Sequence, residues 1–160
     1  VGVEVLAAVA QEGVGKMKTN EFLNQVDTDK IVEAIKLAEA GTSAEIRIHV
    51  SKQKTKDPVK DAALQFIKLG MAKTEARNGV LIFVAPTSQN YAVYADEGIF
   101  KICPQKEWDE MAQALGAEFR EKHFTEGLVA AIRLAGVMLK SHFPFQHGDK
   151  NELDDSISHD

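Results

Sequence analysis

An unbroken run of apolar side chains occupies residues 80–85, between Gly79 and Pro86. A run of this length and composition predicts a strand that is buried on both faces of a sheet. Polar residues follow at 87–90, and a second, mostly apolar run at 91–95 ends at Asp96 and Glu97. Two such runs joined by a short polar segment predict a β-hairpin, so the second run returns antiparallel to the first.

The direction of this hairpin places several polar side chains together. The end of its second strand, at Asp96 and Glu97, lies beside the start of the first, at Arg77 and Asn78. A further strand is predicted at 44–51. If this strand lies parallel to the first hairpin strand, its Glu45 stands at the same end of the sheet. We therefore expect these five side chains to converge there.

Alternation within residues 44–51 predicts that the strand has two different faces. Ile46, Ile48 and Val50 share one face. The other face carries Glu45, Arg47 and His49, and we expect it to be the less buried one.

Helical periodicity marks four further segments. The first two helices are predicted at about 27–40, with Asp27 or Thr28 as N-cap, and at about 58–70, with Asp57 as N-cap. The third helix follows Pro104, and the fourth runs from its N-cap Thr125 to about residue 142. Helices and strands alternate in the first half, so a right-handed crossover should join two parallel strands. The prediction is an α/β sandwich with a mixed sheet of at least three strands.

Composition suits one globular domain: the chain has 160 residues, of which 44% are hydrophobic and 27% charged. A net charge of −5 argues against a nucleic-acid partner. The single cysteine, Cys103, excludes an internal disulfide, and it fits a reducing, cytoplasmic compartment. No apolar run approaches the roughly 20 residues that span a bilayer, and no signal peptide is recognised, so we expect a soluble protein.

The two ends of the chain differ from the middle. Residues 1–20 are expected to be a flexible lead, or one added by cloning; a short packed helix is the alternative. Residues 21–148 should form the single domain. Residues 149–160 carry five acids, and they predict an acidic tail that is solvated or partly docked through Leu153 and Ile157.

Several short elements, spread over roughly residues 27–157, together resemble the TPM domain family, in particular a bacterial branch of soluble, mostly uncharacterised members. They are, in order, Thr42-Ser43-Ala44-Glu45-Ile46-Arg47, Leu69-Gly70-Met71 with Thr74, Arg77-Asn78-Gly79-Val80-Leu81, Asp96-Glu97-Gly98-Ile99, Trp108, Gly127-Leu128, Phe143-Pro144 and Asn151-Glu152-Leu153. Two positions depart from the pattern of that branch: Ala95 stands where Gly is usual, and Phe100 where Asn is usual.

The resemblance implies a three-layer α/β/α sandwich whose small mixed sheet contains the hairpin. It also implies relatives that act in photosystem repair in the thylakoid lumen, or as an accessory protein of a neurotransmitter receptor. Some relatives are described as acid phosphatases or as calcium binders. For this chain we expect a non-enzymatic binding or accessory module that serves the upkeep or assembly of protein complexes through a protein partner. The alternative is a weak acid phosphatase that depends on a divalent cation.

The converging side chains leave two interpretations open. Asp96 and Glu97, with Glu45 and Asn78, offer the oxygen ligands that Ca²⁺ or Mg²⁺ prefers. Alternatively, Arg77 pairs with one acid, and Asp96 accepts backbone N–H bonds in a turn.

Other candidate residues lack a catalytic setting. No serine has a nucleophile-elbow context, Cys103 has no partner motif, and the five histidines show no metal-binding spacing. The sequence therefore predicts no recognisable catalytic set.

Overall fold

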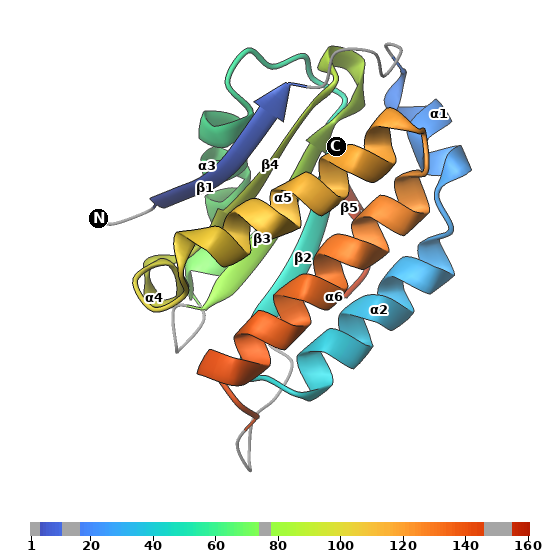
Figure 1. Ribbon diagram of the computed structural model, residues 1–160. Coiled ribbons are helices and arrows are strands. Elements are labelled where there is room, and N and C mark those ends of the chain that lie inside the picture. Colours follow the sequence, from blue (N-terminus) through green and yellow to red (C-terminus); the bar gives the residue numbers. More distant parts are fainter. Residues whose placement is uncertain (1–3, 11–16, 74–77, 146–154) are drawn as a thin grey trace.

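The computed structural model describes residues 4–10, 17–73, 78–145 and 155–160. Its centre is a five-stranded sheet in the order β1-β4-β3-β2-β5 (Figure 1). The strands are β1 (Glu4–Ala10), β2 (Glu45–Val50), β3 (Gly79–Ala85), β4 (Asn90–Ala95) and β5 (Ser158–His159). β2 is parallel to β3 and β5, whereas β4 is antiparallel to β3 and β1. The predicted mixed sheet and its β3–β4 hairpin are confirmed.

Helices cover both faces of the sheet, so the three-layer arrangement is also confirmed (Figure 1). They are α1 (Thr19–Gln25), α2 (Thr28–Ala40), α3 (Pro58–Lys68), α4 (Glu97–Phe100), α5 (Gln105–Arg120) and α6 (Phe124–His142). One face packs against α2, α5 and α6, and α3 covers the other. Within the described residues, no helix combines the length and apolarity needed to cross a membrane.

Strand β3 divides the core between the two faces. Val80, Ile82 and Val84 face the larger core under α2, α5 and α6. The intervening side chains, Leu81, Phe83 and Ala85, belong to the core under α3. Every residue of β3 is buried, as its continuous apolar sequence predicts.

Aspartate caps start two helices as predicted. Asp27 accepts a hydrogen bond from the Lys30 N–H at 3.2 Å, and Asp57 accepts one from the Lys60 N–H at 3.1 Å. The predicted cap at Thr125 is wrong, because α6 already begins at Phe124. The hydroxyl of Thr125 instead accepts a bond from the Asp27 N–H at 3.0 Å, which ties α6 to the start of α2.

The expected loose lead over residues 1–20 is corrected in part. Glu4–Ala10 forms β1, which pairs antiparallel with β4 from Glu4↔Ala95 to Ala10↔Asn90. This pairing uses backbone groups of β4 that would otherwise lie unpaired at a sheet edge. Thr19 already begins α1.

The end of the chain docks onto the sheet, in agreement with the partly docked alternative. Ile157 packs against the larger core, and β5 pairs with the end of β2. Leu153 lies outside the described residues.

The predicted less buried face of β2 is confirmed only at Arg47, which is half-buried, since Glu45 and His49 on the same face are only 2% and 1% exposed. Residues of the C-terminal segment satisfy the imidazole: Ser158 Oγ lies 2.9 Å from Nδ1 and Asp160 Oδ1 lies 2.9 Å from Nε2. The ring also stacks on Phe83. Burial lowers the pKa of His49 and the Asp160 carboxylate opposes that shift, so the ring is held mainly neutral.

Helices α2 and α6 approach each other closely at Gly136. A Cβ atom built on Gly136 would lie 2.8 Å from the Cβ of Ala38 and 3.1 Å from its Cα. No side chain fits at position 136 without displacement of one helix.

Candidate functional site

Three strand ends meet at the place where the sequence predicts a polar cluster. The Glu45 N–H donates to the Asn78 carbonyl at 3.3 Å, and the Asp96 N–H donates to the Gly79 carbonyl at 3.0 Å. Glu45, Asn78 and Asp96 therefore stand at the same end of β2, β3 and β4. We call Glu45, Asn78, Asp96 and Glu97 the acidic sheet end. Arg77, the fifth predicted member, lies outside the described residues.

This group is unusually well buried for polar side chains. Asn78 is 1% exposed and Asp96 is fully buried, while Glu97 is half-buried. Asp96 Oδ1 accepts a hydrogen bond of 2.7 Å from the Glu97 N–H and caps α4. Asn78 Nδ2 donates to the Ser43 hydroxyl at 3.4 Å. The cap on α4 matches the predicted turn around Asp96, and the cation interpretation remains a prediction.

A second acidic pair, Glu39 and Asp155, lies next to Glu45, and no pattern in the sequence predicts it. Glu39, near the end of α2, accepts a hydrogen bond of 2.7 Å from the Ile46 N–H at the edge of β2. Burial, followed by a hydrogen bond with Asp155 and repulsion from Glu45, raises the pKa of Glu39 to about 10. Glu39 is therefore protonated at neutral pH, and it places a neutral carboxyl beside the acidic sheet end.

Replacing Glu39 with Gln should stabilise the protein increasingly as the pH rises. The folded-state pKa of Glu39 lies above the unfolded value of 4.5, so its contribution is fully present below pH 4.5 and is lost as pH rises towards 10. Gln keeps an acceptor for the Ile46 N–H and has no proton to lose. We expect Glu39→Gln to exceed the wild type in unfolding free energy by about 1–2 kcal/mol at pH 8, and by less at pH 5.

Urea unfolding at both pH values checks this result. The matched control is Glu33→Gln, the same change at an exposed position of α2. A pH dependence for Glu39→Gln that parallels the wild type would contradict the assigned protonation.

The predicted acidic tail contributes two observations. Asp155 joins Glu39, and the carboxylate of Asp160 accepts hydrogen bonds of 2.8 Å from the Ser51 hydroxyl and from the Lys52 N–H. Burial opposes ionisation of Asp160, but these donors and His49 hold its pKa below its usual range. The other tail acids, Asp149, Glu152 and Asp154, lie outside the described residues.

Comparison with known proteins identifies the family. The family model of the TPM domain matches residues 17–137, which include β2, β3, β4 and all of the acidic sheet end. A solved structure, the NMR structure of the BA42 protein from the psychrophilic bacterium Bizionia argentinensis sp. nov., is 36% identical and has a TM-score of 0.78. The similarity covers 84% of this chain and 95% of BA42. The comparison with curated proteins gave no match. From the matched residues and the shared fold, we conclude that this chain belongs to the TPM domain family.

Proposed function

We propose that this chain is a non-enzymatic binding module whose acidic sheet end holds a divalent cation, Ca²⁺ or Mg²⁺. The observation that carries the proposal is the burial of Glu45, Asn78 and Asp96 on hydrogen-bonded neighbouring strands. Hard cations favour carboxylate and amide oxygens on a rigid frame. Asp96 and Glu97 would supply the first ligands, with Glu45 and Asn78 beside them.

The task of the module, in this proposal, is the assembly or upkeep of protein complexes. Its partner is a protein, since the net charge of −5 disfavours the phosphate backbone of a nucleic acid. Membership of the TPM family supports this role through the resemblance to relatives that serve photosystem repair or a receptor. A bound cation would rigidify the β4–α4 junction, where Asp96 already caps the helix.

Asp96→Asn should weaken Ca²⁺ binding at least tenfold, because it removes one full charge from the ligand set while Asn still caps α4. We expect Ca²⁺ to raise the melting temperature of the wild type and to give heat in a calorimetric titration. Both signals should be much smaller in Asp96→Asn. The same titrations with Mg²⁺ distinguish the two cations.

Asp57→Asn is the matched control, since it makes the same change at an exposed helix cap on α3. It should bind Ca²⁺ like the wild type. If Ca²⁺ and Mg²⁺ give neither heat nor a shift in melting temperature with the wild type, the polar cluster is a turn and salt-bridge arrangement and the cation proposal is wrong.

A divalent-cation-dependent acid phosphatase is the alternative function. Hydrolysis of a chromogenic phosphate ester by wild type and Asp96→Asn separates it from a binding module. We expect no turnover by either protein. Metal-dependent turnover that the Asp96 variant loses would replace the proposed function with the phosphatase.

A further inference from the structure

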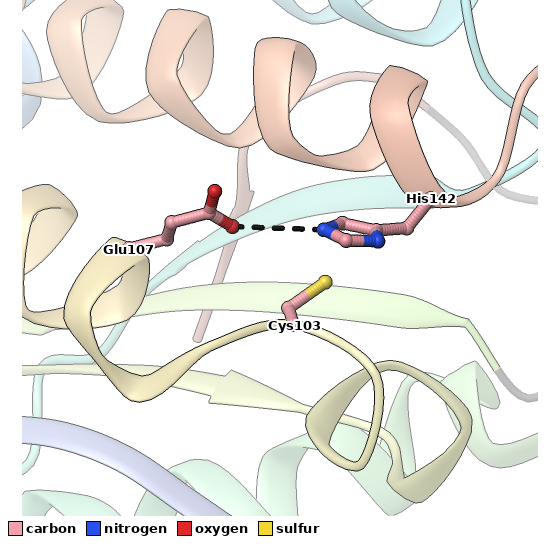
Figure 2. Close-up of side chains that lie close together, drawn as sticks. All are labelled: Cys103, Glu107 and His142. Atoms are coloured by element: carbon pink, nitrogen blue, oxygen red, sulfur yellow. Dashed lines mark ion pairs between the residues drawn. The ribbon is translucent and has the colours of Figure 1, made fainter.

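Three side chains that commonly bind transition metals meet where the start of α5 lies beside the end of α6. Cys103 lies in the turn before α5, Glu107 is in the first turn of α5, and His142 is the last residue of α6. One ligand atom of each lies within 4.8 Å of the others. Figure 2 shows the sulfur, the carboxylate and the imidazole pointing toward one another. We call these residues the Cys-Glu-His cluster.

The fold, and not sequence spacing, assembles this cluster. α5 and α6 pack against each other and are joined by a short turn, so the end of α6 returns to the start of α5 (Figure 1). Cys103 is further fixed by its backbone N–H, which donates to the Ile99 carbonyl at 3.0 Å. The cluster therefore joins the α4–α5 turn to the last turn of α6.

One ligand atom of the cluster has no other polar contact to satisfy it. Glu107 Oε2 is buried and has no hydrogen-bond partner among the described residues. It lies 3.8 Å from His142 Nε2. Cys103 is 5% exposed, and burial together with the Glu107 charge raises the pKa of its thiol to about 12. The side chains of Glu107 and His142 are partly exposed.

We propose that Cys103, Glu107 and His142 form a binding site for one Zn²⁺ ion. Sulfur, imidazole nitrogen and a carboxylate oxygen are the ligands that Zn²⁺ takes, whereas Ca²⁺ and Mg²⁺ prefer oxygen alone. Three protein ligands leave a fourth tetrahedral position for water or for a small ligand. This site differs from the acidic sheet end in both its residues and its cation, so it stands independently of the proposed function.

Binding requires small side-chain movements and the loss of the Cys103 thiol proton. Tetrahedral zinc with bonds of about 2.0–2.3 Å holds its ligand atoms roughly 3.3–3.7 Å apart. The Glu107–His142 pair already lies near this spacing, and rotation of side chains brings the sulfur closer. The S–H bond of Cys103 is exchanged for a Zn–S bond, and the proton passes to the buffer.

The test uses the purified, metal-free chain, titrated first with Zn²⁺ and then with Co²⁺ as a spectroscopic substitute. We expect one Zn²⁺ per chain, and a rise in melting temperature of about 5 °C when Zn²⁺ is well above its Kd. Co²⁺ should give a thiolate-to-metal charge-transfer band in the near ultraviolet. Because Cys103 is the only cysteine in the sequence, that band reports on this site.

Two variants and a matched control locate the ion. Cys103→Ser should abolish the cobalt band, and His142→Gln should weaken Zn²⁺ binding at least tenfold. His123→Gln alters an exposed pair of the same residue types, since His123 Nδ1 lies 2.9 Å from Glu118 Oε2, and it should change Zn²⁺ affinity less than twofold.

The proposal fails if the wild type gives no cobalt band, or if His142→Gln binds Zn²⁺ as tightly as the wild type. His142 is partly exposed at the end of a helix, so this variant remains informative even if Cys103→Ser does not fold. Asp96→Asn should leave Zn²⁺ binding unchanged, which separates this result from the calcium experiment.

Discussion

Replacing Trp108 with Ala should lower the free energy of unfolding by about 3–5 kcal/mol. Trp108 is fully buried in the larger core, where α5 packs on the sheet. Ala leaves a cavity too large for the neighbouring helices to close, so both the transfer free energy and the packing of the ring are lost. Urea unfolding followed by circular dichroism measures the effect, since the variant has no tryptophan fluorescence.

Trp108→Phe is the informative control. The indole Nε1 is buried and has no hydrogen-bond partner within the described part of the chain. Phe removes that N–H together with part of the ring, so we expect the free energy of unfolding to fall by only about 1–2 kcal/mol. A loss for Phe as large as that for Ala would mean that the N–H makes a bond that stabilises the fold.

Gly136→Val should destabilise the protein by about 2–3 kcal/mol through overpacking. The Cβ of any side chain at 136 meets Ala38 of α2 at a distance that real contacts do not reach. Valine adds two methyl groups at this point, and α2 must move away from α6. The higher helix propensity of Val relative to Gly offsets only a few tenths of a kcal/mol. Chemical unfolding measures the change.

A second substitution tests the mechanism of that loss. Ala38→Gly removes the atom that the new side chain meets, so the double variant should be more stable than the sum of the single effects implies, by at least about 1 kcal/mol. Additive effects would show that the cost at position 136 arises within α6 and not from its contact with α2.

Local chemistry made most of the fold predictable. Asp57 followed by Pro58 fixed the start of α3, and the apolar run after Gly79 fixed a strand that is buried on both faces. β1 was missed because residues 5–10, which follow Glu4, are all apolar and show neither alternation nor a turn signal. Its pairing with β4 is a long-range contact that propensity does not encode.

The candidate site was predictable as far as strand direction determines it. A hairpin and one parallel neighbour were enough to bring Glu45, Asn78 and Asp96 together. Glu39 was not predictable, because in the sequence it is one polar residue of an amphipathic helix. Its burial arises from the way α2 meets the edge of β2.

The burial of Glu45 and His49 on the polar face of β2 was not predictable for a similar reason. Alternating Glu45, Arg47 and His49 indicates a solvated face when the strand is considered alone. The partners of His49 are Ser158 and Asp160, and they lie more than a hundred residues further along the chain. The Cys-Glu-His cluster likewise escapes spacing rules because α6 supplies its third member.

The positions of β1 and β5 have a consequence for the order of folding. The central strands β2, β3 and β4 come from one continuous part of the chain, whereas the two outer strands come from residues 4–10 and 158–159. β1 can pair only after β4 has been synthesised. The outer edge of β2 can pair only after residues 158–159 have been synthesised. Such non-local pairings form slowly, since much of the chain must close before they contribute. On the ribosome, the inner hairpin and its helices can therefore assemble early, but the sheet gains its final edge only after the whole domain has emerged.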